Sequence, residues 1–170
     1  MGRCAEFLVP GACVRQGWSV MQVPQAAVEL AKRFEGFHRT PKLDPDRAYP
    51  YVCPAGFWTI GYGHLCAADH APITRDQAEA YLSADLEKAL RATLRYCPVL
   101  TTVSDKRLAA IVDFTFNLGA GRLQASTLRR RVNLLDWTGA VQEISKWVHG
   151  GGKVLPGLVL RRQAEAALLH

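Results

Sequence analysis

The first segment with a regular pattern of apolar and polar positions begins after Met21. In VPQAAVELAKRFEGF the apolar side chains recur at near-helical spacing. Pro24 suits the start of a helix, and Gly36 ends the pattern. We therefore expect a helix over this segment, with Glu35 at its C-terminal end.

A second helix is predicted from Thr74 onward. Gln77 stands three residues after Thr74, which is the spacing of a capping box. The apolar positions that follow keep the 3.6-residue period of a helix: Ala78, Tyr81, Leu82, Leu86 and Leu90. The same period and the glycines between segments predict further helices at about 104–117, 122–134, 136–149 and 156–169, with Ser104 as the cap of the first.

The segment between these helices has a different pattern. Residues 57–62 (FWTIGY) are β-branched or aromatic, lie between Gly56 and Gly63, and predict a short strand in a hairpin. The prolines of HRTPKLDPDRAYP exclude regular helix before it. We predict an α+β fold, in which a small β lobe near residues 48–66 is joined by a long helix to a larger helical lobe.

The length of 170 residues suits one domain. Residues 1–20 show no regular period and contain several glycines and a proline. We interpret them as a flexible extension or a misassigned start, and residues 21–170 as a single catalytic domain. Glu6 and Pro10 interrupt the early apolar stretch, so the sequence predicts a protein made in the cytoplasm.

The charge balance favours an anionic partner. The formal net charge is +6, and basic residues strongly outnumber acidic ones from Arg122 onward. Nucleic acid is not expected, because no zinc spacing, helix-turn-helix signature or aromatic RNA-binding motif accompanies the charge. Contact of the Arg129–Arg131 region with an anionic membrane surface is one hypothesis, and a merely solvated basic face is the alternative.

Cysteine and histidine usage argues against a metal centre. The chain has five cysteines: Cys4, Cys13, Cys53, Cys66 and Cys97. Their number is odd and no two form a CxxC pair, which disfavours a zinc site or a disulfide framework. The histidines show no HExxH or similar ligand spacing. We expect no metal, no cofactor and a monomeric protein.

Glu35 and the segment after it could carry glycosidic chemistry. Cleavage of a glycosidic bond needs an acid to protonate the leaving oxygen and a second group that stabilises positive charge or activates water. FEGF…AYPYVCPAGFWTIGYGHL resembles the catalytic segment of the phage-type (T4-like) lysozymes, the endolysins of glycoside hydrolase family 24. Five residues separate Cys53 from Thr59, as in that family. DFTFNLG and GLVLRRQAE resemble later family segments, so the similarity covers residues 21–170.

The resemblance implies roles for individual residues. Glu35 would be the general acid, Cys53 would occupy the second catalytic position, and Thr59 would hold the attacking water in an inverting reaction. Other positions would line the glycan cleft: Leu65, Phe116 and Gln142. His64 and Asp85 would form a structural pair. The implied reaction is hydrolysis of the β-1,4 bond between N-acetylmuramic acid and N-acetylglucosamine in peptidoglycan, after release through a holin lesion.

The sequence departs from the family pattern in two ways. Seventeen residues separate Glu35 from Cys53, more than the family normally has. The excess, at Thr40 to Pro50, adds Asp44 and Asp46 as alternative carboxylates. The second departure is Cys53 itself, since aspartate is commoner at the second catalytic position. A thiol with a pKa of about 8.5 is mostly neutral at pH 7, whereas an aspartate is ionised.

Two other functions stay open from the sequence. Cys53 and His64 could serve a cysteine-dependent peptidoglycan peptidase or amidase. Alternatively, the chain could be a wall-binding module that holds peptidoglycan without turnover. The presence of both Glu35 and Thr59 favours the lysozyme interpretation over a pure binder.

Overall fold

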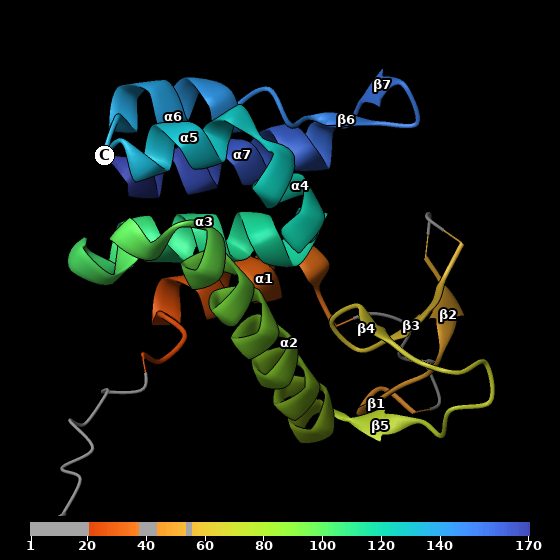
Figure 1. The fold of residues 1–170 in the computed structure, drawn as a ribbon. Coiled ribbons are helices and arrows are strands. Elements are labelled where there is room, and N and C mark those ends of the chain that lie inside the picture. Colours follow the sequence, from red (N-terminus) through yellow and green to blue (C-terminus); the bar gives the residue numbers. More distant parts are fainter. Residues whose placement is uncertain (1–20, 38–43, 54–55) are drawn as a thin grey trace, which may run out of the picture.

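The computed structural model describes residues 21–37, 44–53 and 56–170. Its described part has two lobes, a larger helical one and a smaller β lobe, joined by the long helix α2 (Arg75–Tyr96) (Figure 1). A helix of 22 residues is about 33 Å long, so α2 reaches from the β lobe into the helical lobe. The α+β fold predicted from the sequence is confirmed.

The helical lobe is built around α3 (Asp105–Leu118), which is buried at eight consecutive positions, Leu108 to Thr115. A helix that is apolar on all sides must be covered on all sides. Other helices supply that cover: α1 (Gln25–Glu35), α4 (Ala120–Ala125), α5 (Thr127–Asn133), α6 (Trp137–Ile144), α7 (Pro156–Leu169) and the 3₁₀ turn η1 (Pro98–Thr102). α3 packs against both α1 and α7, and α1 also contacts α7.

The β lobe contains short antiparallel strands. β2 (Tyr51–Val52), β3 (Trp58–Ile60) and β4 (His64–Leu65) form one sheet, in which Thr59 pairs with Tyr51 on one side and Leu65 on the other. β1 (Arg47–Ala48) pairs with β5 (Ile73–Thr74), directly before α2. A separate hairpin in the helical lobe consists of β6 (His149–Gly150) and β7 (Lys153–Val154).

Several predicted elements are present as expected. α1 ends at Glu35, and Gly36 follows with φ 68°, a conformation that glycine adopts without strain. The capping box of α2 is complete: Gln77 N donates to Thr74 Oγ1 over 3.3 Å, and Thr74 N donates to Gln77 Oε1 over 2.9 Å. α3 follows Ser104, although the Ser104 side chain makes no capping hydrogen bond.

Two predicted helices were wrong in extent. The segment 122–134 is divided into α4 and α5 at Ser126, whose hydroxyl donates to Leu123 O over 2.8 Å and accepts from Arg129 N over 3.0 Å. This side chain competes for backbone groups and ends one helix while capping the next. The segment 136–149 is helical only to Ile144, because His149 belongs to the β6–β7 hairpin that turns through Gly151 and Gly152.

Residues 1–20 lie outside the described residues, so the expectation of an N-terminal extension stays a prediction. Within the parts that the structure describes, no helix combines the length and the apolar character needed to cross a membrane.

Candidate active site

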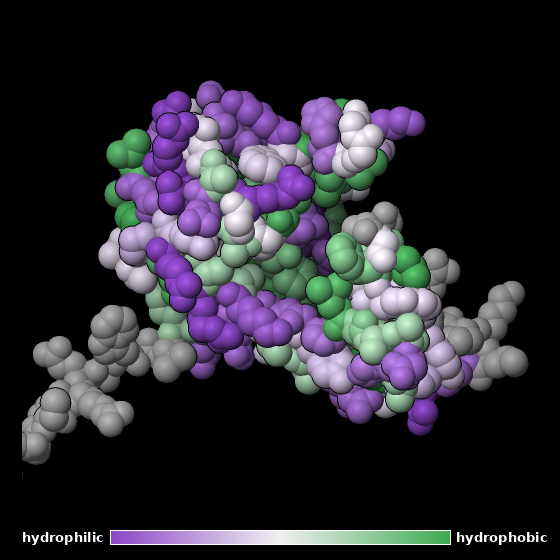
Figure 2. Space-filling model, turned by 45° about the vertical axis from the view of Figure 1, so that its right-hand side comes forward, coloured by the Kyte–Doolittle hydropathy of each residue, from purple (hydrophilic) through white to green (hydrophobic). Residues whose placement is uncertain are grey.

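A cleft of about 560 Å³ opens between the helical lobe and the β lobe. Figure 2 shows the molecule hollowed there, with apolar and polar surface at the rim. The cleft is lined from both lobes and from α2, by Glu35, Tyr62, Gly63, His64, Leu65, Asp85, Lys88, Ala89, Ala92, Thr115, Phe116, Asn117 and Ala120.

Glu35 lies in this cleft at the last position of α1. Its Oε1 accepts a hydrogen bond of 2.6 Å from Arg161 Nη1. Its Oε2 faces Gly63, where a Cβ atom added to the glycine would stand 3.4 Å from that oxygen. The carboxylate is therefore held on one oxygen by the helical lobe and presents the other to the β lobe.

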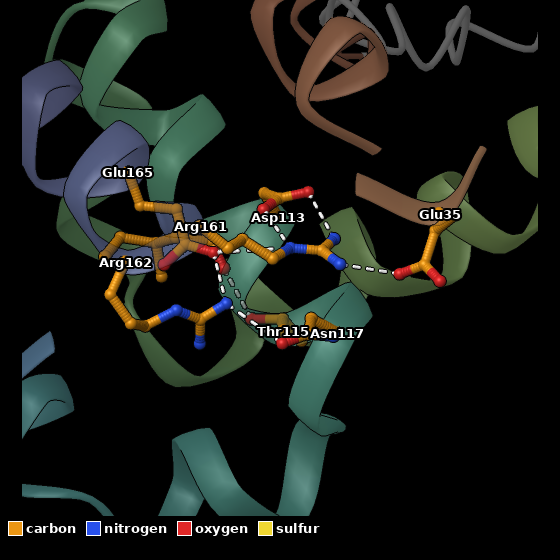
Figure 3. Close-up of polar contacts among 8 residues, drawn as sticks. Glu35, Asp113, Thr115, Asn117, Arg161, Arg162 and Glu165 are labelled. Atoms are coloured by element: carbon orange, nitrogen blue, oxygen red, sulfur yellow. Dashed lines mark hydrogen bonds and ion pairs between the residues drawn. The ribbon is translucent and has the colours of Figure 1, made fainter. Parts of the chain in front are cut away.

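Arg161 is the buried anchor of Glu35. It is 3% exposed and also donates to both carboxylate oxygens of Asp113, over 2.8 and 2.7 Å (Figure 3). Burial alone would lower the pKa of Arg161, but its contacts with Asp113 and Glu35 raise that pKa above its ordinary value. A permanently charged guanidinium held by Asp113 fixes where Glu35 can point.

The next residue of α7 holds another part of the cleft wall. Arg162 Nη2 donates to Glu165 Oε1 over 2.6 Å and to Asn117 Oδ1 over 2.9 Å (Figure 3). Burial raises the pKa of Glu165 well above its usual range, against the opposing pull of Arg162. Asn117 lines the cleft, so its amide links the buried Arg162–Glu165 pair to the cleft surface.

The predicted pairing of His64 with Asp85 is present. The two atoms His64 Nδ1 and Asp85 Oδ2 are 2.7 Å apart, and the His64 ring stacks on Tyr81 with centroids 4.4 Å apart. Lys88 Nζ binds the other Asp85 oxygen over 2.9 Å. Both partners are about a quarter exposed and line the cleft, so the pair joins β4 to α2 at the cleft wall.

Cys53 and Thr59 lie in the β2–β3 hairpin. The half-buried Cys53 closes the turn: its N–H donates to Phe57 O over 2.9 Å, and its carbonyl accepts from Gly56 N over 2.8 Å. Thr59 is buried, and its hydroxyl donates to Tyr51 O over 3.4 Å. Neither residue is among those that line the cleft.

Two of the three residues expected at the glycan cleft line it, and the third does not. Leu65 and Phe116 line the cleft from opposite lobes, and Leu65 is 66% exposed. Gln142 is exposed on α6 and is not among the lining residues. Of the insertion, Thr40 to Leu43 lie outside the described residues, while Asp44 accepts a hydrogen bond from Tyr49 Oη over 3.1 Å, which raises the pKa of Tyr49.

The sequence reasoning missed Arg161 as the partner of Glu35 and Asp113 as a partner of Arg161. Both stood in segments already noted for their resemblance, DFTFNLG and GLVLRRQAE, but Arg161 lies 126 positions after Glu35 in sequence. The available signal was one aspartate in the first segment and two adjacent arginines in the second, each within a largely apolar helix. Buried charges require partners, so these side chains could have been expected to pair.

The described residues contain no cluster of three or more histidine, cysteine, aspartate or glutamate side chains that could hold a metal ion.

The described contacts also give no support to a cysteine peptidase or amidase that would use Cys53 with His64. His64 directs its Nδ1 to Asp85, and among the described contacts none joins it to Cys53. Cys53 also stands in a hairpin turn and not at a helix N-terminus, where a nucleophilic thiolate is favoured.

Known proteins match this chain over most of its length. The family model described as phage lysozyme matches residues 32–165. An endolysin of Acyrthosiphon pisum secondary endosymbiont phage 1 is 35% identical over 155 residues, which cover 88% of this chain and 99% of that one.

Solved structures agree with the sequence comparison. The muramidase domain of SpmX from Asticaccaulis excentricus superposes with a TM-score of 0.73 and 32% identity, covering 87% of this chain and 97% of that one. The endolysin of Escherichia coli O157:H7 phage FAHEc1 has a TM-score of 0.69 and 31% identity, covering 88% and 93%. The chain therefore belongs to the phage lysozyme family, and it is a muramidase that hydrolyses the β-1,4 bond between N-acetylmuramic acid and N-acetylglucosamine in bacterial peptidoglycan.

Proposed function

We propose that Glu35 is the general acid of this muramidase. The observation that carries the proposal is the hold of Arg161 on a single oxygen of Glu35, at 2.6 Å, inside the cleft. A guanidinium can only donate hydrogen bonds, so Glu35 Oε1 must be an acceptor. When Glu35 is protonated, the proton consequently sits on Oε2, the oxygen that faces Gly63 across the cleft.

This placement suits protonation of a leaving oxygen. A glycan strand in the cleft lies between the β lobe and the helical lobe, and the scissile oxygen would approach Glu35 Oε2. Transfer of the proton to that oxygen leaves Glu35 as a carboxylate, and Arg161 stabilises the new charge without moving.

The β2–β3 hairpin would supply the other half of an inverting reaction. We assign Thr59 to the attacking water: its hydroxyl hydrogen is directed to Tyr51 O, so its oxygen lone pairs can accept a hydrogen bond from water. Such a water keeps a lone pair for attack on the anomeric carbon as the bond to the protonated leaving oxygen breaks, and the proton that it releases passes to solvent water. On the family resemblance we place Cys53, a polarisable and weakly accepting side chain of the same hairpin, at the second catalytic position.

The proposal is tested by the release of reducing ends from purified Gram-negative peptidoglycan. We expect Glu35→Gln to lower turnover by about 10²–10⁴-fold, because the amide cannot donate an acidic proton. Cys53→Asp is expected to retain activity, whereas Thr59→Val is expected to lose most of it. The reducing sugar formed first should have the inverted, α configuration, measurable by proton NMR of a short oligosaccharide product.

Two results would contradict these assignments. Full turnover of Glu35→Gln would remove Glu35 from the acid role. Loss of activity in Cys53→Ala, with new amino groups in place of reducing ends, would instead bring back the peptidase or amidase hypothesis.

We further propose contact with an anionic surface through α4, α5 and the turn that follows. Arg122 on α4 and Arg130 and Arg131 on α5 are exposed, and α5 leads into a turn in which Leu134 and Leu135 are 74% and 48% exposed. Cationic side chains next to exposed apolar ones suit lipid headgroups. The same charge is compatible with a monomer that repels its own copies.

The route to the wall is also a proposal. The described helices carry charged side chains on their outer faces, and moving such charges through hydrocarbon is costly. We expect the folded enzyme to reach the periplasm through a membrane lesion made by a holin. Expression in Escherichia coli with and without a holin tests this, and lysis without holin or chloroform would contradict it.

A further inference from the structure

Asn117 is a polar residue of the cleft wall that has no assigned role. It lies near the C-terminal end of α3, between Phe116 and the Gly119 turn, and lines the cleft. Its Oδ1 accepts the hydrogen bond of 2.9 Å from Arg162 Nη2 (Figure 3). Within the described part of the chain, its Nδ2 donates no hydrogen bond.

The orientation of the Asn117 amide is fixed by chemistry. Arg162 has only donors, so the amide oxygen must face it and the NH₂ group must face away. Arg162 cannot move aside, because it is 1% exposed and is held by the fully buried Glu165 over 2.6 Å. A flipped amide would set NH₂ against a guanidinium, at the cost of a charge-assisted hydrogen bond.

We propose that Asn117 Nδ2 donates a hydrogen bond to a carbonyl oxygen of bound peptidoglycan. The inference rests on the proposed function, since it places substrate in the cleft that contains Glu35. Amide and acyl carbonyls are the strongest neutral acceptors of the substrate, and a cleft donor of fixed direction selects for them. Two carbonyls share this chemistry: the acetamido group of the sugars and the first carbonyl of the peptide stem.

The adjacent arginines of α7 thus serve two different side chains. Arg161 orients the carboxyl group of Glu35, and Arg162 orients the amide group of Asn117. Because both arginines belong to one helical turn, the distance between acid and donor is fixed by α7 and does not depend on loop conformation. This favours one register of the glycan, with a carbonyl at Asn117 and a glycosidic oxygen at Glu35.

The first test is Asn117→Asp, which keeps an oxygen toward Arg162 and replaces the donor by an oxygen that can only accept. We expect kcat/KM on intact peptidoglycan to fall about 10–100-fold at neutral pH, where the introduced carboxylate is ionised, mainly through KM and with Tm unchanged or higher. Asn133→Asp is the matched control, because it adds the same charge on α5, where its amide binds Tyr96 O. In ¹⁵N NMR, the Asn117 side-chain amide should shift when a soluble peptidoglycan fragment that carries stem peptides is added, and that of Asn133 should not.

The second test separates the two carbonyl sources. Glycan strands stripped of stem peptides by an amidase keep the acetamido groups and carry a lactyl carboxylate, but lose every carbonyl of the peptide stem. The ratio of kcat/KM of the wild type to that of Asn117→Asp is measured on stripped strands and on intact peptidoglycan. If the ratio is the same on both substrates, the acceptor is the acetamido carbonyl. If the ratio is near one on stripped strands, the acceptor is the stem carbonyl. Equal kcat/KM for Asn117→Asp and Asn133→Asp on intact peptidoglycan overturns the inference. Glu35→Gln is measured alongside: if it is inactive while Asn117→Asp is normal, only this inference fails, and if it is active, the proposed acid fails as well.

Discussion

Single residues at the cleft act through hydrogen-bond direction. Arg161 and Arg162 can only donate, and this one property determines which oxygen of Glu35 is held and which end of Asn117 is presented. Lysine at either position would keep the charge without the planar, many-donor geometry that binds two partners at once. The backbone at Gly63 matters in the same way, since it leaves room beside Glu35 Oε2.

Two glycines with nearly the same backbone allow a matched test at this scale. Gly63 has φ 85° and faces Glu35 Oε2 at 3.4 Å, whereas Gly56 has φ 86° and open space around its Cβ position. We expect Gly63→Ala and Gly56→Ala each to lower the free energy of unfolding by about 1–2 kcal/mol, from left-handed strain. Only Gly63→Ala should also lower kcat, measured by reducing-end release. An equal loss of kcat in both variants would show that backbone strain alone is responsible.

Cys97 gives a pH prediction. Burial raises the pKa of this thiol from near 9 to about 11, against a smaller opposing effect of Arg129. Between these values the unfolded chain loses a proton that the folded chain keeps, so stability falls as pH rises from about 9 to 11. The loss should approach about 2–3 kcal/mol. Urea unfolding across this pH range measures it, and Cys97→Ala should show a correspondingly flatter fall; parallel curves would contradict the assignment.

Elements of secondary structure decide how the two lobes are joined. α2 begins in the β lobe at Arg75, directly after β5, and carries Asp85 and Lys88 along the cleft to the helical lobe (Figure 1). The pair His64–Asp85 ties β4 to this helix, so the β lobe is anchored on α2 by side chains as well as by the chain itself. α7 performs the comparable task for the helical lobe, because it holds Glu35 of α1 and Asn117 of α3.

The start of α2 can be tested by removing its capping box. Thr74→Ala removes the acceptor for Gln77 N and is expected to lower the free energy of unfolding by about 1 kcal/mol. Thr101→Ala, whose hydroxyl binds Pro98 O in the exposed turn η1, is the control, with an expected change below about 0.5 kcal/mol. Urea denaturation compares the two. Equal effects would mean that the cap does not contribute beyond an ordinary surface hydroxyl.

At the scale of the whole molecule, charge and apolar exposure are distributed unevenly. The turn between α5 and α6 lies beside the C-terminus, at the end of the helical lobe that is remote from the β lobe (Figure 1). Exposed Arg130 precedes this turn, and Leu134 and Leu135 form it. Contact of this end with an anionic surface would leave the cleft accessible to glycan.

Vesicle binding tests that arrangement. We expect the wild type to bind vesicles containing phosphatidylglycerol and to lose about 10–30-fold in affinity in the double variant Arg130→Gln, Arg131→Gln, because each basic side chain near an anionic surface contributes about 1 kcal/mol. The control double variant Arg33→Gln, Arg91→Gln removes the same charge from α1 and α2. Sedimentation with neutral vesicles should show no binding, and equal losses in both double variants would contradict a localised contact.

The sequence alone carried the family resemblance, the α+β class and most helix positions. It could do so because these depend on local patterns: the 3.6-residue period, the Thr74–Gln77 cap and the glycines at Gly36 and Gly63. Its errors were also local. A single serine at 126 divides a segment whose apolar period runs through without a break, and a hairpin after Ile144 replaces a predicted last helical turn.

What only the tertiary structure decided is which charges meet. Arg161 lies 126 residues from Glu35 and 48 from Asp113, and no period in the sequence relates them. They meet because α1, α3 and α7 bury their apolar faces against one another, which leaves Asp113 and Arg161 buried together and the partly exposed Glu35 beside them at the cleft. Each buried charge is costly alone and is stable only when paired. Packing therefore selected the partners, and with them the direction in which Glu35 and Asn117 face the cleft.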